Sequence, residues 1–316
     1  MTEIALDAFG VVTRAEAIAA AGSYRVRVAQ ETGVLLSPWT GVLVDGTRCT
    51  QTGTLAAAAL RAVGPGAVLA GPTAARLHGC TAAPATPVHV VVPYEHPRRS
   101  RPGLVVHNGP LPTVDRVDLD GLPVLTLDRV VADLLCRGRP QDALAVADQA
   151  LARLDPITRE GFRAAVAARL ATRPDPRGTL RATRLLGLAT GRAESPAESR
   201  LLFRVVDAGF PVPEVNASVC GIDGREIYRL DLAWTELRIA IEYHGYAAHV
   251  GRTAQDEARA EDLRRRGWIL VEVWSDDADD PRVETELAAA FRRRGVSTEG
   301  RRPGVLQARR HREPRR

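Results

Sequence analysis

Acidic and histidine side chains gather around one short apolar stretch in the last third of the chain. In the run RIAIEYHG, Glu242 and His244 stand two positions apart, so on a β-strand both side chains point to the same face. Asp231 lies on the preceding predicted strand, and a turn near Thr235 would let hairpin pairing bring its carboxylate beside Glu242. Two carboxylates held that close repel each other and raise a pKa unless a cation lies between them. We therefore favour a binding or active site here over a solvated sheet face or a salt-bridge network.

A divalent metal ion is the cation that such a site predicts. Mg²⁺ prefers hard oxygen ligands, which Asp231, Glu242 and the backbone carbonyl of Tyr243 would supply, and Mn²⁺ can take its place. An ion of this kind lowers the pKa of a bound water and stabilises charge on a phosphate being cut. His244 would accept the proton of that water, and His249 would donate one to the leaving oxygen or orient the phosphate.

The order of these residues resembles the active-site pattern of PD-(D/E)XK nucleases, in which two acids and a lysine line one sheet edge. Asp231 and Glu242 match the acids, and His244 occupies the position of the lysine. The resemblance implies a DNA endonuclease, a phosphodiester hydrolase, with catalytic residues Glu198, Asp231, Glu242, His244 and His249. The helical Glu198 also lies three positions after Ser195, where a capping box explains it equally well.

Within that superfamily the stretch is more similar to the very short patch repair endonucleases. These carry an aspartate that opens one strand, a histidine-glycine pair that closes the next and a second histidine five residues on, as do Asp231, His244 with its glycine, and His249. Their metal lies on the aspartate and on the carbonyl before the first histidine, which corresponds to Tyr243. Their cysteine-containing zinc site has no counterpart in this sequence, and the position of Glu242 is usually apolar in them, so the resemblance implies no particular substrate or mismatch.

Over most of its length the chain resembles a bacterial family that joins an AbiEi-type antitoxin N-terminal winged helix to a C-terminal endonuclease-like domain. That resemblance implies DNA as a partner and a toxin protein as a further one. Three classes of function stay open. The paired His244 and His249 favour a nuclease, whereas the missing lysine favours a non-enzymatic antitoxin-type transcriptional regulator with a vestigial nuclease fold. The third class is a protein–protein adaptor.

The N-terminal segment predicts a winged helix-turn-helix, with three short helices followed by a hairpin. Helices are expected near Leu6, after a capping box that starts at Thr13, and from Ser23 onward, and the run VLLSPWTGVLV predicts the wing. The helix with Arg25 and Arg27 would face the major groove of DNA. Because residues 1–48 hold four arginines against five acids, protein contacts and DNA contacts are equally favoured.

The predicted fold class is α/β with an α+β multi-domain organisation. The expected segments are a winged helix (1–48), a small α/β connector (49–135), a helical linker (136–193), a restriction-endonuclease-like αβββαβ domain (194–295) and a basic disordered tail (296–316). In the nuclease-like segment Ser195 starts a helix, three strands follow, a charged helix stops at Gly267, and WILVEVW is a buried strand. Arg252 and Arg259 are candidate DNA phosphate contacts, although Arg259 and the arginines after it also fit a solvated helix face.

Composition limits the chemistry and the location of the protein. All 43 basic residues are arginine, so no lysine can act as a base or a phosphate clamp. The net charge of +5 is concentrated in residues 292–316, whose ten arginines against two glutamates fit either phosphate contacts or a solubilising tail. The four cysteines lie far apart and indicate neither zinc nor disulfides, which fits a reducing cytoplasm. A membrane span is not expected, and the sequence predicts no oligomeric state.

Overall fold

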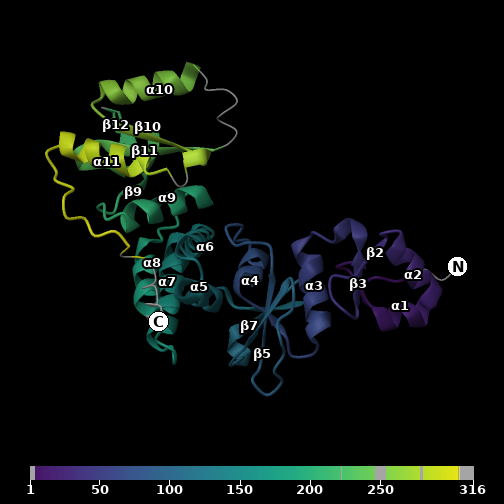
Figure 1. Cartoon of the computed structure of the whole chain (residues 1–316). Coiled ribbons are helices and arrows are strands. Elements are labelled where there is room, and N and C mark those ends of the chain that lie inside the picture. Colours follow the sequence, from purple (N-terminus) through teal and green to yellow (C-terminus); the bar gives the residue numbers. More distant parts are fainter. Residues whose placement is uncertain (1–3, 222, 246–253, 278–279, 305, 307–316) are drawn as a thin grey trace, which may run out of the picture. The chain divides into compact units, whose positions relative to one another are not determined.

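The structure, a computed structural model, describes residues 4–221, 223–245, 254–277, 280–304 and 306 (Figure 1). The chain folds into two compact units, residues 1–134 and 135–316. In the described ranges, helices accompany three β-sheets, which confirms the predicted mixed α/β class. None of the helices described is long and apolar enough to cross a membrane.

The first unit begins with two helices and a small antiparallel sheet of strand order β1-β3-β2. The elements are β1 (Val11–Thr13), α1 (Arg14–Ala21), α2 (Ser23–Glu31), β2 (Leu35–Leu36) and β3 (Val42–Asp45). Val12, Val26 and Leu43 are buried in one core cluster. Thr13 and Glu16 make both hydrogen bonds of the predicted capping box, and the predicted hairpin is formed by β2 and β3.

The prediction of a helix near Leu6 was wrong. Residues 7–10 form a turn in which the Asp7 carboxylate accepts hydrogen bonds from the backbone N–H groups of Phe9 and Val11, each 2.9 Å long. Gly10 closes this turn with a φ of 76°. A short acidic side chain that bonds the local backbone in this way competes with helix formation, and β1 follows instead.

The rest of the first unit is built on a five-stranded mixed sheet of order β6-β5-β4-β8-β7. The elements are η1 (Gly46–Arg48), α3 (Thr52–Val63), β4 (Val68–Leu69), α4 (Gly71–Leu77), β5 (Val88–Val92), β6 (Leu104–Asn108), η2 (Thr113–Asp115), β7 (Arg116–Leu119) and β8 (Leu122–Leu125). Helices and strands both occur in this segment, as predicted for a small α/β connector. Arg98 and Arg101, in the basic loop between β5 and β6, donate to the carbonyls of Val63 and Ala62 at the end of α3.

The second unit combines a helical layer with a four-stranded sheet. The helices before the sheet are α5 (Leu127–Arg137, which crosses from the first unit), α6 (Pro140–Ala152), α7 (Pro156–Ala171), α8 (Thr179–Leu188) and α9 (Pro196–Asp207). The remaining elements are β9 (Glu214–Cys220), β10 (Glu226–Trp234), η3 (Thr235–Leu237), β11 (Ile239–His244), α10 (Ala254–Arg265), β12 (Ile269–Trp274), η5 (Ser275–Asp277) and α11 (Arg282–Arg293). The predicted order of helix, three strands, helix, strand and helix is therefore confirmed.

The sheet of the second unit has the order β12-β11-β10-β9, with β9, β10 and β11 antiparallel and β12 parallel to β11. The helices α9 and α10 lie on opposite sides of it (Figure 1). On the α10 side, Leu263 belongs to one buried cluster with Leu230 and Ala240. Phe291 of α11 is fully buried with its ring centroid 5.0 Å from that of Trp234. The predicted acids Asp231 and Glu242 lie on β10 and β11, the two central strands of this sheet, which packing on both sides holds in place.

Several half-buried arginines of the second unit bind the ends of helices. Arg159 donates to the carbonyls of Leu151 and Leu154 at the end of α6. Arg163 donates to the carbonyls of residues 186 and 189 at the end of α8, and Arg181 donates to that of Cys136 in α5. The last carbonyls of a helix have no partner within the helix, so these guanidinium groups satisfy them.

Candidate functional site

Asp231 and Tyr243 meet where β10 and β11 separate. The two strands pair in antiparallel register up to Leu232 and Ile241, after the turn at η3 in which Arg238 adopts a left-handed φ of 49°. One residue beyond this pairing, Oδ2 of Asp231 accepts a hydrogen bond of 2.7 Å from the backbone N–H of Tyr243. The sequence pattern predicted the Asp231 carboxylate beside Glu242, and the hairpin brings it to the backbone N–H of Tyr243.

Three acids from three different elements come within electrostatic reach of one another. Burial raises the pKa of Asp231 from 3.8 to about 6, against the lowering effect of the Tyr243 N–H. The negative charges of Glu198 on α9 and Glu242 on β11 raise the same pKa, and the positive charge of Arg259 lowers it. A carboxyl group with a raised pKa beside two other acids is the kind of perturbed group that marks functional sites.

Glu198 is buried at the start of α9, with a relative exposure of 8%. The Ser195 hydroxyl accepts from the Glu198 N–H at 3.2 Å, which is one half of the expected capping box. The Glu198 carboxylate does not complete it, because Oε2 accepts from the N–H of Glu194 at 2.8 Å and from the Asn216 side chain at 3.2 Å. Glu198 therefore contributes its backbone N–H to the helix cap and its carboxylate to the acid cluster.

Glu242 is nearly inaccessible and forms a two-point ion pair with Arg259 of α10. The guanidinium contacts one carboxylate oxygen at 2.6 Å and donates to the other at 3.0 Å. Arg259 also donates to the carbonyl of Arg229 at 2.7 Å and lies over the ring of Tyr228. Burial raises the pKa of Glu242, and the charge and hydrogen bond of Arg259 oppose that rise. Sequence reasoning proposed Arg259 as a DNA contact and did not find this pairing.

His244 lies at the end of β11, in register with Trp274 of the neighbouring parallel strand. The two rings stack with centroids 4.4 Å apart and an angle of 28° between their planes. Nε2 of His244 is buried and has no hydrogen-bond partner among the residues described. Buried polar atoms are usually paired, so this nitrogen calls for a water, an ion or a substrate as its partner. The other two predicted residues of this region, His249 and Arg252, lie outside the described residues.

The donor chemistry at this site fits a hard divalent cation in part. Among the residues described, there is no group of three or more His, Cys, Asp and Glu side chains that could hold a metal ion. The expected set consists of two carboxylates and a carbonyl and is not a group of that kind. Asp231 fits the role of a carboxylate ligand, and the hydrogen bond from the Tyr243 N–H brings it beside the residue whose carbonyl is the other expected ligand. Glu242 fits less well, because both of its oxygens contact Arg259.

The predicted DNA-contacting arginines of α2 lie on the first unit and are exposed. Arg27 lies 3.7 Å from the Glu31 carboxylate and over the ring of Tyr24, which is 68% exposed. Arg25 lies next to this group on the same helix. The exposed face of α2 is thus mixed in charge and partly aromatic, which fits the two roles left open for it.

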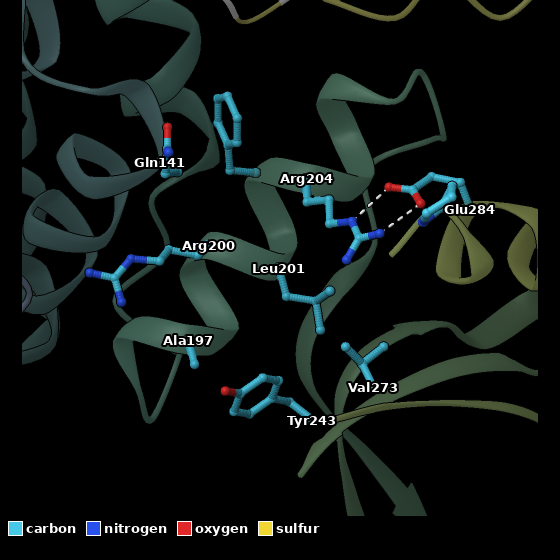
Figure 2. A pocket seen from close by; sticks show the side chains of 10 residues that line it. Gln141, Ala197, Arg200, Leu201, Arg204, Tyr243, Val273 and Glu284 are labelled. Atoms are coloured by element: carbon cyan, nitrogen blue, oxygen red, sulfur yellow. Dashed lines mark hydrogen bonds and ion pairs between the residues drawn. The ribbon is translucent and has the colours of Figure 1, made fainter. Parts of the chain in front are cut away.

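A cavity of about 640 Å³ lies beside Tyr243 on the side of α9 (Figure 2). Its lining comes from α6, α9, β11, β12 and the start of α11, and consists of Gln141, Ala197, Arg200, Leu201, Phe203, Arg204, Tyr243, Val273, Pro281 and Glu284. The Tyr243 hydroxyl points toward Ala197, and Arg204 is paired with Glu284. No signal in the sequence indicates this cavity, because its residues come from segments far apart in the chain.

The relatives of this chain are proteins described as uncharacterized. No known family profile matches the sequence. Two proteins of Mycobacterium tuberculosis, the uncharacterized protein MT2308 of strain CDC 1551 / Oshkosh and the uncharacterized protein Rv2248 of strain ATCC 25618 / H37Rv, are each 33% identical to this chain over 211 residues. The match covers 65% of this chain and 73% of each relative. The chain therefore belongs to the same family as these two mycobacterial proteins.

Proposed function

We propose that the second unit carries a PD-(D/E)XK-like nuclease domain that hydrolyses DNA phosphodiesters with the help of Mg²⁺. The observation that carries this proposal is the meeting of Asp231 with Glu198, Glu242 and the Tyr243 N–H at the central strands β10 and β11. The order of elements supports it, because α9, three antiparallel strands, α10 and a parallel fourth strand are the αβββαβ arrangement that the resemblance implies. The two mycobacterial relatives leave this function open.

The residues of this site have distinct roles in the proposed reaction. Asp231 and the Tyr243 carbonyl would hold the ion, which supplies a more acidic water and charge stabilisation on the phosphate when bound. Nε2 of His244 would accept a proton from the attacking water, since it is buried and unpaired in the described residues. The stacked Trp274 ring fixes the orientation of the imidazole. Burial, with the charges of Glu198 and Glu242 adding to it, raises the pKa of Asp231 to about 6 when no cation is present.

The first unit would bring DNA to this domain. We propose that α1, α2 and the β2–β3 hairpin act as a winged helix that binds DNA through Arg25 and Arg27. The order of two helices and a hairpin supports this part of the proposal. The exposed Tyr24 and the near-neutral charge equally support a protein partner, for which a toxin protein is the candidate.

A specific contact favours a second candidate function, that of a non-enzymatic antitoxin-type regulator. The ion pair with Arg259 satisfies the charge of Glu242 without a metal. If Asp231 and Glu198 served only to stabilise the hairpin, the domain would keep the nuclease fold but would not hydrolyse DNA. Both candidates need DNA binding, and only the nuclease needs Asp231 and His244 for a reaction.

Cleavage assays with matched variants separate the two candidates. Supercoiled plasmid and mismatched duplexes are incubated with Mg²⁺ or Mn²⁺ and the wild-type chain, Asp231→Asn or His244→Ala. Glu236→Gln is the control, since this exposed acid lies in the same hairpin at η3. The nuclease proposal predicts cutting by wild type and Glu236→Gln and at least a hundredfold loss in the other two variants. DNA binding without cutting by any of the four proteins supports the regulator instead.

A further inference from the structure

The ion pair of Glu242 and Arg259 buries its acid and leaves its cation accessible. The Glu242 side chain is 6% exposed, whereas that of Arg259 is 33% exposed. Both carboxylate oxygens are directed at the guanidinium, at 2.6 Å and 3.0 Å. The pair therefore presents positive charge, and not a carboxylate, at the surface of the acid cluster.

Arg259 is held in place from several directions. One guanidinium nitrogen donates to the Arg229 carbonyl at 2.7 Å, and the group lies 5.7 Å from the centre of the Tyr228 ring. The Tyr228 hydroxyl donates in turn to Asp262, one turn further along α10. An arginine has five N–H donors, and the contacts to Glu242 and the Arg229 carbonyl use three of them. A guanidinium fixed in this way with donors to spare is well suited to bind an oxyanion.

The position of Arg259 points to a phosphate as that anion. Arg259 donates to the carbonyl of Arg229, two residues before Asp231 on β10, and to Glu242, two residues before His244 on β11. The neighbouring Tyr243 N–H donates to Asp231, so the guanidinium lies near the acid that the proposed nuclease would use to hold its metal ion. We infer that Glu242 is a positioning residue that orients Arg259 to bind a DNA phosphate next to Asp231, and that Glu242 is not a metal ligand. This inference rests on the proposed function and changes the ligand set expected from the sequence. In this arrangement Asp231 would bind the metal ion, and Arg259 binds the phosphate.

Metal binding tests the first half of the inference. Mn²⁺ is titrated into the full-length chain at neutral pH, and bound ion is measured by electron paramagnetic resonance. Asp231→Asn should weaken Mn²⁺ binding at least tenfold, because it removes the anionic ligand. Glu242→Gln keeps the size of the side chain and should change the affinity by less than about threefold. If Glu242→Gln weakens Mn²⁺ binding as much as Asp231→Asn does, Glu242 is a ligand and the inference is overturned.

DNA binding tests the second half. The affinity for a 20-base-pair duplex is measured by fluorescence anisotropy over a series of NaCl concentrations, in EDTA. Arg259→Gln should lower the slope of log affinity against log salt by about one, as expected for one lost phosphate contact. Glu242→Gln should lower the slope in the same direction, because Arg259 loses its support. The matched control is Arg264→Gln on the same helix, whose nearest acid, Glu272, is 3.7 Å away. An equal change in this control would indicate general attraction to the helix and overturn the inference.

The double variant Glu242→Gln/Arg259→Gln separates positioning from general damage. It removes both charges of the Glu242–Arg259 pair together and leaves neither without its partner, so it should fold even where a single variant is unstable. Its salt slope should equal that of Arg259→Gln, because Glu242 acts only through Arg259, whereas independent roles would add. Additive losses therefore argue against the inference. DNA binding with the expected slopes but without cleavage leaves the inference standing and defeats the nuclease. A wild-type chain that binds neither Mn²⁺ nor DNA defeats both.

Discussion

Replacing Asp231 with asparagine should stabilise the second unit at neutral pH. Burial and the charges of Glu198 and Glu242 raise the pKa of Asp231 from 3.8 to about 6. Between these two pH values the folded state binds more protons than the unfolded chain, so stability falls as pH rises. The contribution of the protonated carboxyl is fully present below pH 3.8 and is lost above pH 6. A difference of this size between the folded and unfolded pKa of Asp231 corresponds to about 3 kcal/mol in the free energy of unfolding.

Asparagine keeps the shape of the side chain and its oxygen acceptor for the Tyr243 N–H, but it carries no charge. We therefore expect Asp231→Asn to raise the free energy of unfolding by about 2 to 3 kcal/mol at pH 7.5 and to have little effect at pH 4. The difference between variant and wild type should grow between pH 4 and pH 6.

Urea unfolding followed by tryptophan fluorescence measures this effect at a series of pH values. Trp234, Trp268 and Trp274 lie in the second unit, and Trp39 lies in the first. A Trp39→Phe background makes the signal report on the second unit alone, which avoids averaging over two units that can unfold separately. A variant that is equally or less stable than wild type at pH 7.5 would refute the argument, because it would mean that the aspartate is stabilised in its ionised form.

Three further substitutions test the packing around the site, all by urea unfolding of the second unit. Ser195→Ala removes the side-chain cap of α9 and should cost about 1 kcal/mol, with no loss expected from Ser195→Asp, which can cap as well. Arg204→Gln breaks a two-point contact with Glu284, made at 2.6 Å and 2.8 Å, and should cost about 2 to 3 kcal/mol, whereas the 88% exposed Arg177 should tolerate the same change without measurable loss. Phe291→Ala empties a fully buried position against Trp234 and should cost about 3 to 5 kcal/mol, and a value under 1 kcal/mol would contradict the packing described.

The elements of the second unit were predictable because each carries its own local signals. Ser195 and Pro196 mark the start of α9, Gly267 with a φ of 86° marks the end of α10, and the strands have apolar runs that end at turns. The meeting of Asp231 with the Tyr243 peptide also followed from local information, since a tight hairpin connects their strands. Short-range patterns of this kind fix the order of the elements and the register of the hairpin.

The charge pairing around the site was not predictable, because it depends on contacts between distant segments. Glu242 and Arg259 are joined only when α10 packs across the sheet. The arginines posed the same difficulty throughout the chain. In sequence they indicate phosphate contacts, yet Arg98, Arg163 and Arg181 donate to carbonyl groups, mostly at helix ends. A count of arginines therefore overstates the surface charge that is available to DNA.

Among the described residues around Asp231, acids outnumber cations, and this imbalance bears on the proposed function. Among the described groups that shift the pKa of Asp231, Glu198 and Glu242 are acids and Arg259 is the cation, and Arg259 is committed to Glu242. A purely structural cluster would gain stability by losing Asp231 at neutral pH, since an ionised, buried and unpaired carboxylate is unfavourable. A cation bound at Asp231 removes that cost and makes the ionised form the favoured one. Under the proposed function, the unfavourable ionised form of Asp231 is what we expect of the site before a cation binds, and the ion pair of Glu242 with Arg259 leaves the aspartate without that arginine as its own partner.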